Sequence, residues 1–104
     1  MGPGREMEMA EYILFMHDDA AADDASAWDT YLQALDRKGV FEGGSEIGSG
    51  VCVRKSGAPP AVTRHLAGYI RVTAATIEEA KSLLAGNPHF EAGGTIEIRE
   101  LPRT

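Results

Sequence analysis

The chain has 104 residues, of which 43% are hydrophobic and 25% charged, and its formal net charge is −6 at pH 7. This length and composition are typical of one globular domain that buries a core without metals or disulfides. The acidic balance argues against nucleic-acid binding, which usually depends on a basic stripe of lysine and arginine. Because Cys52 is the only cysteine, the chain forms no internal disulfide.

The N-terminal residues differ in composition from the rest of the chain. We expect residues 1–9 to form a flexible leader and residues 10–104 to form the single domain. No apolar run approaches the roughly 20 residues that span a bilayer, and the leader lacks the apolar core of a signal peptide. These patterns predict a protein that does not bind membranes and that resides in the cytoplasm.

A strand and a helix are predicted in the first 40 residues. Residues 12–16 are apolar at every position, which is typical of a central strand covered on both faces. Four side chains then recur at the i, i+3, i+4 and i+7 spacing of one helix face: Trp28, Tyr31, Leu32 and Leu35. We therefore expect a helix over residues 26–38, ended by Gly39.

The middle of the chain is rich in glycine and ends in a proline pair. Residues 40–47 are expected to form a second strand, and a glycine turn leads into a third strand that begins at 51–54. Pro59-Pro60 excludes a central strand there. The glycine-rich stretch 43–50 lacks the lysine ending of a phosphate-binding loop and precedes no helix. We read its glycines as a bulge and a tight turn, and we expect no cofactor.

The last third of the chain predicts a strand, a helix and a final strand. Residues 68–74 alternate with a period of two, which places Ile70, Val72 and Ala74 on one face. Thr76 and Glu79 have the spacing of a capping box, in which Glu79 reaches back to the Thr76 amide. The helix that follows ends at Gly86, an Asn-Pro corner presents His89, and residues 94–101 alternate again.

This order of elements predicts an α+β fold, a ferredoxin-like sandwich with an extra hairpin strand. Right-handed crossovers place both helices on one face of the sheet and leave the other face open. In the last two strands the open face carries polar and amphipathic side chains: Tyr69, Arg71, Thr73, Thr95, Glu97 and Arg99. Because the first strand adds apolar side chains to that face, we expect a homodimer in which a second sheet completes a dimeric α+β barrel.

Four segments together resemble one protein family: residues 12–18, 28–44, 68–80 and 86–99. They are similar to the YCII-related family, which includes the YciI-like and DGPF-domain proteins. The resemblance implies a dimeric α+β barrel and, for YciI-like relatives, a His–Asp pair proposed as catalytic. Asp18 stands at the position of the family aspartate, whereas Tyr31 stands where the family histidine precedes a Leu-x-x-Leu pattern. The Asp-Gly-Pro-Phe motif is replaced by residues 59–65.

The candidate catalytic residues are His17, Asp18 and His89, and the candidate substrate-binding residues are Tyr31 and Arg71. A neutral imidazole held by a carboxylate acts as a general base near neutral pH. The first hypothesis is an enzyme that transfers a proton, or catalyses an elimination, on a polar or aromatic metabolite. Its site would be a cleft between the sheet and the first helix, with His17 or His89 oriented by Asp18.

Each of these residues also has a structural interpretation. His17, Asp18 and Asp19 are equally consistent with a surface turn, and adjacent strand residues point to opposite faces, so we expect no metal site. The alternative hypothesis is a ligand-binding or protein-interaction module without catalysis. An enzyme should place a histidine about 3 Å from a carboxylate inside a concave pocket, and a module need not.

Overall fold

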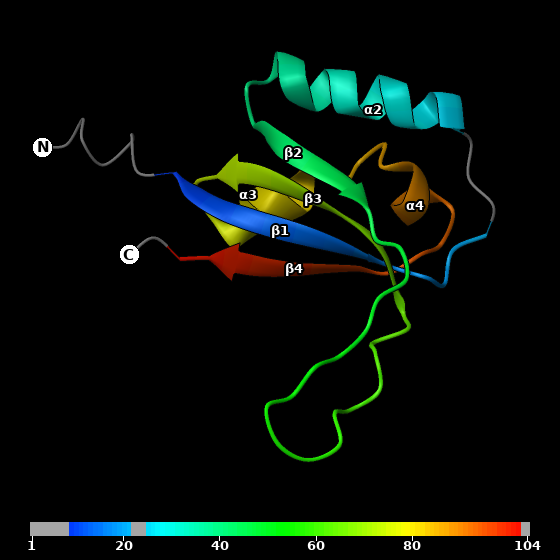
Figure 1. The fold of residues 1–104 in the computed structure, drawn as a ribbon. Coiled ribbons are helices and arrows are strands. Elements are labelled where there is room, and N and C mark those ends of the chain that lie inside the picture. The colour runs from blue at the N-terminus through cyan, green and yellow to red at the C-terminus, as the bar shows by residue number, and fades with distance from the viewer. Residues whose placement is uncertain (1–8, 22–24, 103–104) are drawn as a thin grey trace, which may run out of the picture.

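The computed structural model describes residues 9–21 and 25–102 and shows a small α+β domain (Figure 1). Most of the expected leader, residues 1–8, lies outside the described residues. The elements follow in the order β1 (Ala10–His17), α2 (Ala25–Arg37), β2 (Phe41–Glu46), β3 (Leu66–Ala74), α3 (Ile77–Ser82), α4 (Pro88–Glu91) and β4 (Ile96–Leu101). The predicted strands and helices are found within a few residues of their expected bounds, apart from the third strand.

The sheet has four antiparallel strands in the order β2-β3-β1-β4. β1 is therefore a central strand, as its apolar sequence predicts. Leu14 lies opposite Ile70 of β3 and opposite Ile98 of β4. Because paired residues point to the same face, this register sets one apolar row of the sheet against the helices.

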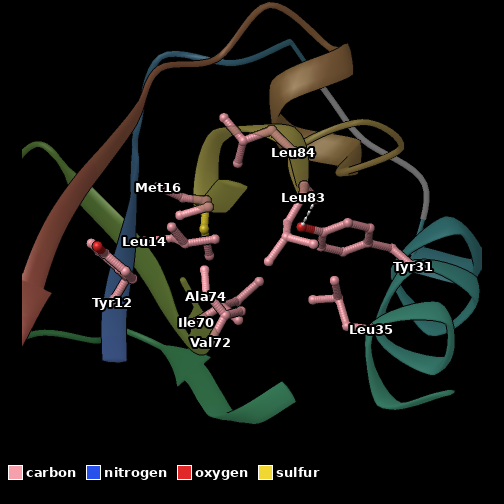
Figure 2. Close-up of a cluster of buried hydrophobic side chains, with 11 residues drawn as sticks. Tyr12, Leu14, Met16, Tyr31, Leu35, Ile70, Val72, Ala74, Leu83 and Leu84 are labelled. Atoms are coloured by element: carbon pink, nitrogen blue, oxygen red, sulfur yellow. Dashed lines mark hydrogen bonds between the residues drawn. The ribbon is translucent and has the colours of Figure 1, made fainter. Parts of the chain in front are cut away.

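The hydrophobic core lies between this face of the sheet and the helices (Figure 2). Its buried side chains come from two strands, from α2 and from the segment of α3: Tyr12, Leu14, Met16, Ile70, Val72, Ala74, Tyr31, Leu35, Ala80, Leu83 and Leu84. The shared face predicted for the alternate residues of β3 is confirmed by this burial. Each fully buried leucine contributes roughly 1.5–3 kcal/mol, so the core supplies most of the driving force for folding.

Two short helices follow β3, each with a side-chain cap. In α3 the Glu79 amide donates to Thr76 Oγ1 at 3.1 Å, as the capping box predicts. The Glu79 carboxylate, however, accepts from the Ala75 amide at 2.6 Å rather than from Thr76. The helix α4 was not predicted from the sequence. Its N-cap is Asn87, whose Oδ1 accepts from the Phe90 amide at 2.9 Å, and Pro88 occupies the first turn.

The predicted third strand does not form. Residues 47–65 instead make a long loop, here called the arm, that extends away from the sheet (Figure 1). Val51 and Val53 are 83% and 86% exposed. A strand needs a neighbour to pair with its backbone, and no described strand lies beside residues 51–54. The sheet therefore has four strands among the described residues, and the prediction of an extra hairpin strand is wrong.

The face of the sheet opposite the helices is not covered by any described element. In Figure 1 the viewer looks onto β1, with α3 behind the sheet. Ile13 and Phe15 of β1 are only half-buried, although Tyr12 and Leu14 beside them are buried. Phe15 lies opposite Tyr69 on β3. The open face predicted from the sequence is therefore present in the single chain.

Candidate functional site

A histidine–carboxylate pair lies at one end of the open face. His17 is the last residue of β1, and its Nε2 lies 2.9 Å from Oε1 of Glu97 on β4. The hydrogen bond to His17 is the largest cause that lowers the pKa of Glu97, and the bond from Arg99 Nη1, 3.1 Å long, lowers it further. Both partners are partly solvent-accessible, with side-chain exposures of 22% for His17 and 36% for Glu97. A proton donor or acceptor at this position is reachable from solvent.

A second histidine packs against this pair. The rings of His17 and His65 meet edge to face, with centroids 4.9 Å apart. The Asp18 amide also donates to the His65 carbonyl at 2.7 Å, which ties the end of the arm to the end of β1. His65 is not among the site residues predicted from the sequence. The register of β1 with β3 would have indicated that His65 lies near His17, because the next residue, Leu66, lies opposite His17.

Asp18 does not orient His17. The structure places Asp18 in an exposed turn, where its carboxylate makes no hydrogen bond to any described residue. The neighbouring Asp19 accepts two hydrogen bonds from Thr95, at 2.8 Å from the amide and 2.6 Å from the hydroxyl. The hydroxyl bond is the largest cause that lowers the pKa of Asp19, followed by the amide bond. The expected His17–Asp18 pair is thus replaced by His17–Glu97, and Asp19 anchors the start of β4.

His89 is buried rather than presented to solvent, with 7% of its surface exposed. Its Nε2 lies 3.8 Å from Asp19 Oδ1 and has no hydrogen-bond partner among the described residues. The ring packs so closely against Gly94 that an added Cβ there would overlap it. His89 therefore lies near Asp19 but beneath the surface of the domain.

The two expected substrate-binding residues are separated from the His17–Glu97 pair. Tyr31 is buried, and its hydroxyl donates to the Leu83 carbonyl at 2.7 Å; burial is the main cause that raises its pKa (Figure 2). Arg71 lies on the open face, where it donates to Glu11 at 2.7 Å and to the Glu42 carbonyl at 2.8 Å. Tyr31 thus has a structural partner for its hydroxyl. Arg71 is opposite Ile13, about 13 Å along β1 from His17 at the usual rise of a strand.

The structure has a cleft between the sheet and the first helix, where the sequence reading expected a site. The cleft has a volume of about 540 Å³ and lies between α2 and the paired ends of β2 and β3. Its walls are mainly apolar and include Met16, Trp28, Leu32, Phe41 and Ile70. Among the described residues, no histidine lines it. The cleft and the His17–Glu97 pair are therefore two separate candidate sites.

Two glycines on the strands, Gly44 of β2 and Gly68 of β3, line the cleft. Gly44 lies opposite Ile70, and Gly68 lies opposite both Met16 and Glu46. A Cβ on Gly44 would stand 2.5 Å from the Tyr69 carbonyl oxygen, and one on Gly68 would stand 3.3 Å from Met16 Cε. Close packing within the sheet thus selects glycine at both positions.

In the part of the chain that the structure describes, no group of three or more His, Cys, Asp or Glu side chains is placed to hold a metal ion. Over the same residues, no helix has the length and apolar character needed to cross a membrane. Comparison of the sequence with protein-family models finds no match. Comparison with curated proteins finds none either. A functional assignment therefore depends on the geometry of the two candidate sites.

Proposed function

We propose that the protein is a cytoplasmic YCII-related homodimer with a ferredoxin-like sandwich in each chain. The strand order β2-β3-β1-β4, with two helical crossovers, supports this architecture. The half-buried apolar residues of the open face, Ile13 and Phe15, support a second sheet as its cover. In such a dimer the His17–Glu97 pair would lie at the edge of an enclosed space.

The proposed activity is proton transfer or elimination on a polar or aromatic metabolite, with His17 as general base. The observation that carries it is the 2.9 Å contact between His17 Nε2 and Glu97 Oε1. With Nε2–H donating to the carboxylate, Nδ1 presents a lone pair that accepts a proton from the substrate. Glu97 fixes the tautomer and stabilises the imidazolium that forms. Phe15 and Tyr69, opposite one another beside the pair, offer an apolar surface to an aromatic ring.

A thermal-shift screen of metabolites, followed by turnover assays on the hits, tests the enzyme. Replacing a general base typically lowers kcat by about 10²–10⁴-fold, so we expect that loss for His17→Ala and a smaller one for Glu97→Gln. Asp18→Asn is the matched control, because it removes the carboxylate next to His17 in sequence, which makes no hydrogen bond to any described residue. Full activity in Glu97→Gln together with a large loss in Asp18→Asn would refute the proposed pair.

The second candidate is a ligand-binding module without catalysis, and the cleft is the observation that favours it. The cleft has the volume and apolar walls of a small-molecule site, but its described lining residues include no proton-transferring histidine. A hit from the same screen that binds the protein but is not converted supports this candidate. Binding that survives His17→Ala and is lost on a substitution in the cleft places the ligand there.

A further inference from the structure

We infer that the cleft binds small molecules with a ring-sized apolar body and a positive charge, such as arylalkyl amines. This inference rests on the ligand-binding function proposed for the cleft and adds the chemical class of the ligand. It depends on three features: the size and walls of the cleft, the fixed position of one aromatic ring, and the charge at the rim.

The walls of the cleft suit an aromatic or branched apolar group. Its volume of about 540 Å³ lies within the roughly 300–1,000 Å³ of typical ligand sites. Leu32 and Trp28 line the helix side, and Phe41 and Ile70 line the sheet side. Burying an apolar ring between them is favourable by the area that it removes from water.

The ring of Trp28 is held in place by the core. It meets the Tyr31 ring edge to face, with centroids 5.9 Å apart. Tyr31 is fixed in turn by its hydrogen bond to the Leu83 carbonyl, 2.7 Å long. A wall that is positioned before the ligand arrives loses little conformational freedom on binding. Trp28 also presents the aromatic ring on which a cation is most strongly attracted.

The charge at the cleft favours cations. Among the described residues that line the cleft, Glu46 is the single one that ordinarily carries a charge at neutral pH, and none is a lysine, arginine or histidine. Glu46 lies opposite Gly68, which lies opposite the buried Met16, so its side chain is on the helix side of β2. The net charge of −6 adds a field of the same sign. A carboxylate ligand would meet repulsion here, and an ammonium group would meet attraction.

Three probes of nearly the same shape test this inference: 2-phenylethylamine, 2-phenylethanol and phenylacetate. Trp28 is the only tryptophan in the chain, so its fluorescence reports directly on the cleft. We expect the amine to bind about three- to tenfold more tightly than the alcohol, and the carboxylate to bind most weakly. Raising the salt from about 0.01 M to about 1 M should reduce the preference for the amine, because screening shortens the range of charge attraction.

Glu46→Gln should bring the affinity for the amine close to that for the alcohol, without weakening the alcohol. Glu42→Gln is the matched control, because it removes one negative charge from the same strand at a residue that does not line the cleft. Should Glu46→Gln fail to fold, the salt dependence of the native protein still tests the charge attraction.

Different outcomes overturn the ligand class and the binding function of the cleft. Equal binding of the three probes, or tightest binding of phenylacetate, overturns the inferred ligand class and leaves the cleft as a binding site. The absence of any Trp28 response to all three probes overturns the inference, and it counts against the ligand-binding function of the cleft. An amine preference that Glu46→Gln and Glu42→Gln reduce equally would trace the selectivity to the general field and overturn the role of Glu46.

Discussion

His17 and Glu97 are 80 residues apart in the sequence, and their side chains lie 2.9 Å apart across β1 and β4. The contact exists because β4 returns beside β1 with Glu97 opposite Phe15. His17, two residues beyond Phe15 on the same face, reaches the carboxylate diagonally. The proposed proton-transfer pair thus depends on the register between the first and last strands.

Removing the His17 ring should raise the pKa of Glu97. The hydrogen bond to His17 is the main cause of the lowered value, so His17→Ala should move the pKa of Glu97 back toward its ordinary 4.5. Arg99→Gln should raise it by less, because the Arg99 bond ranks second. Carboxyl-carbon NMR titration measures both changes. A Glu97 pKa that does not respond to His17→Ala contradicts the pair, and Arg64→Gln, in the exposed arm, is the control.

The lowered pKa of Glu97 also predicts how stability depends on pH. A carboxylate whose pKa is lower in the folded state stabilises the protein above the unfolded value, here near 4.5. The contribution is lost as the pH falls through the folded pKa. We therefore expect His17→Ala to lose less stability than the native protein on acidification below about pH 4.5, measured by urea unfolding as a function of pH. Equal acid sensitivity of the two proteins would contradict this linkage.

Thr95→Val should loosen the start of β4. It removes the hydroxyl bond that most strongly lowers the pKa of Asp19. The Asp19 pKa should rise, and the melting temperature near pH 7 should fall. Thr95→Ser keeps the hydroxyl and should behave like the native protein, whereas Thr63→Val, in the exposed arm, should have no effect. A melting temperature unchanged by Thr95→Val would show that the hydroxyl bond to Asp19 adds nothing to stability.

The sequence predicted those elements whose signal is local. Alternation in residues 68–74 and the helical stripe through Trp28 each report on one element and its buried face, and both agree with the structure. The prediction of a third strand was wrong. The valines in residues 51–54 have a high strand propensity, but a strand also needs a neighbouring strand to pair with.

The site residues were harder to predict because their contacts are between distant parts of the chain. Asp18 adjoins His17 in sequence but does not bond to its ring, and Glu97 reaches that ring only through the pairing of β1 with β4. Sequence alternation placed Glu97 on the open face but did not indicate which residue of β1 it would meet. The burial of His89 depends likewise on α4, which the sequence reading missed.

Tyr31→Phe should destabilise the protein. It removes the buried hydrogen bond to the Leu83 carbonyl and leaves that carbonyl without its donor, at a cost of about 1–3 kcal/mol in the free energy of unfolding. Tyr69→Phe is the control, because the Tyr69 hydroxyl makes no hydrogen bond to the described residues. Urea denaturation measures both variants. A stability unchanged in Tyr31→Phe, with a large loss of ligand affinity, would instead restore Tyr31 as a substrate-binding residue.

Phe15→Asp should separate the proposed dimer. Phe15 lies half-buried in the middle of the open face, opposite Tyr69, where a second sheet would cover it. An unpaired charge buried in an interface costs about 3 kcal/mol or more, which raises the dissociation constant more than 100-fold.

Phe90→Asp is the control, because Phe90 lies on α4, away from the open face, and is already 44% exposed. Light scattering at micromolar concentration should therefore find dimers for the native chain and for Phe90→Asp, and monomers for Phe15→Asp. A native chain that is monomeric at this concentration would contradict the proposed dimer. A Phe15→Asp variant that stays dimeric would place the interface on another surface, and the enclosure proposed for His17 and Glu97 would then be lost.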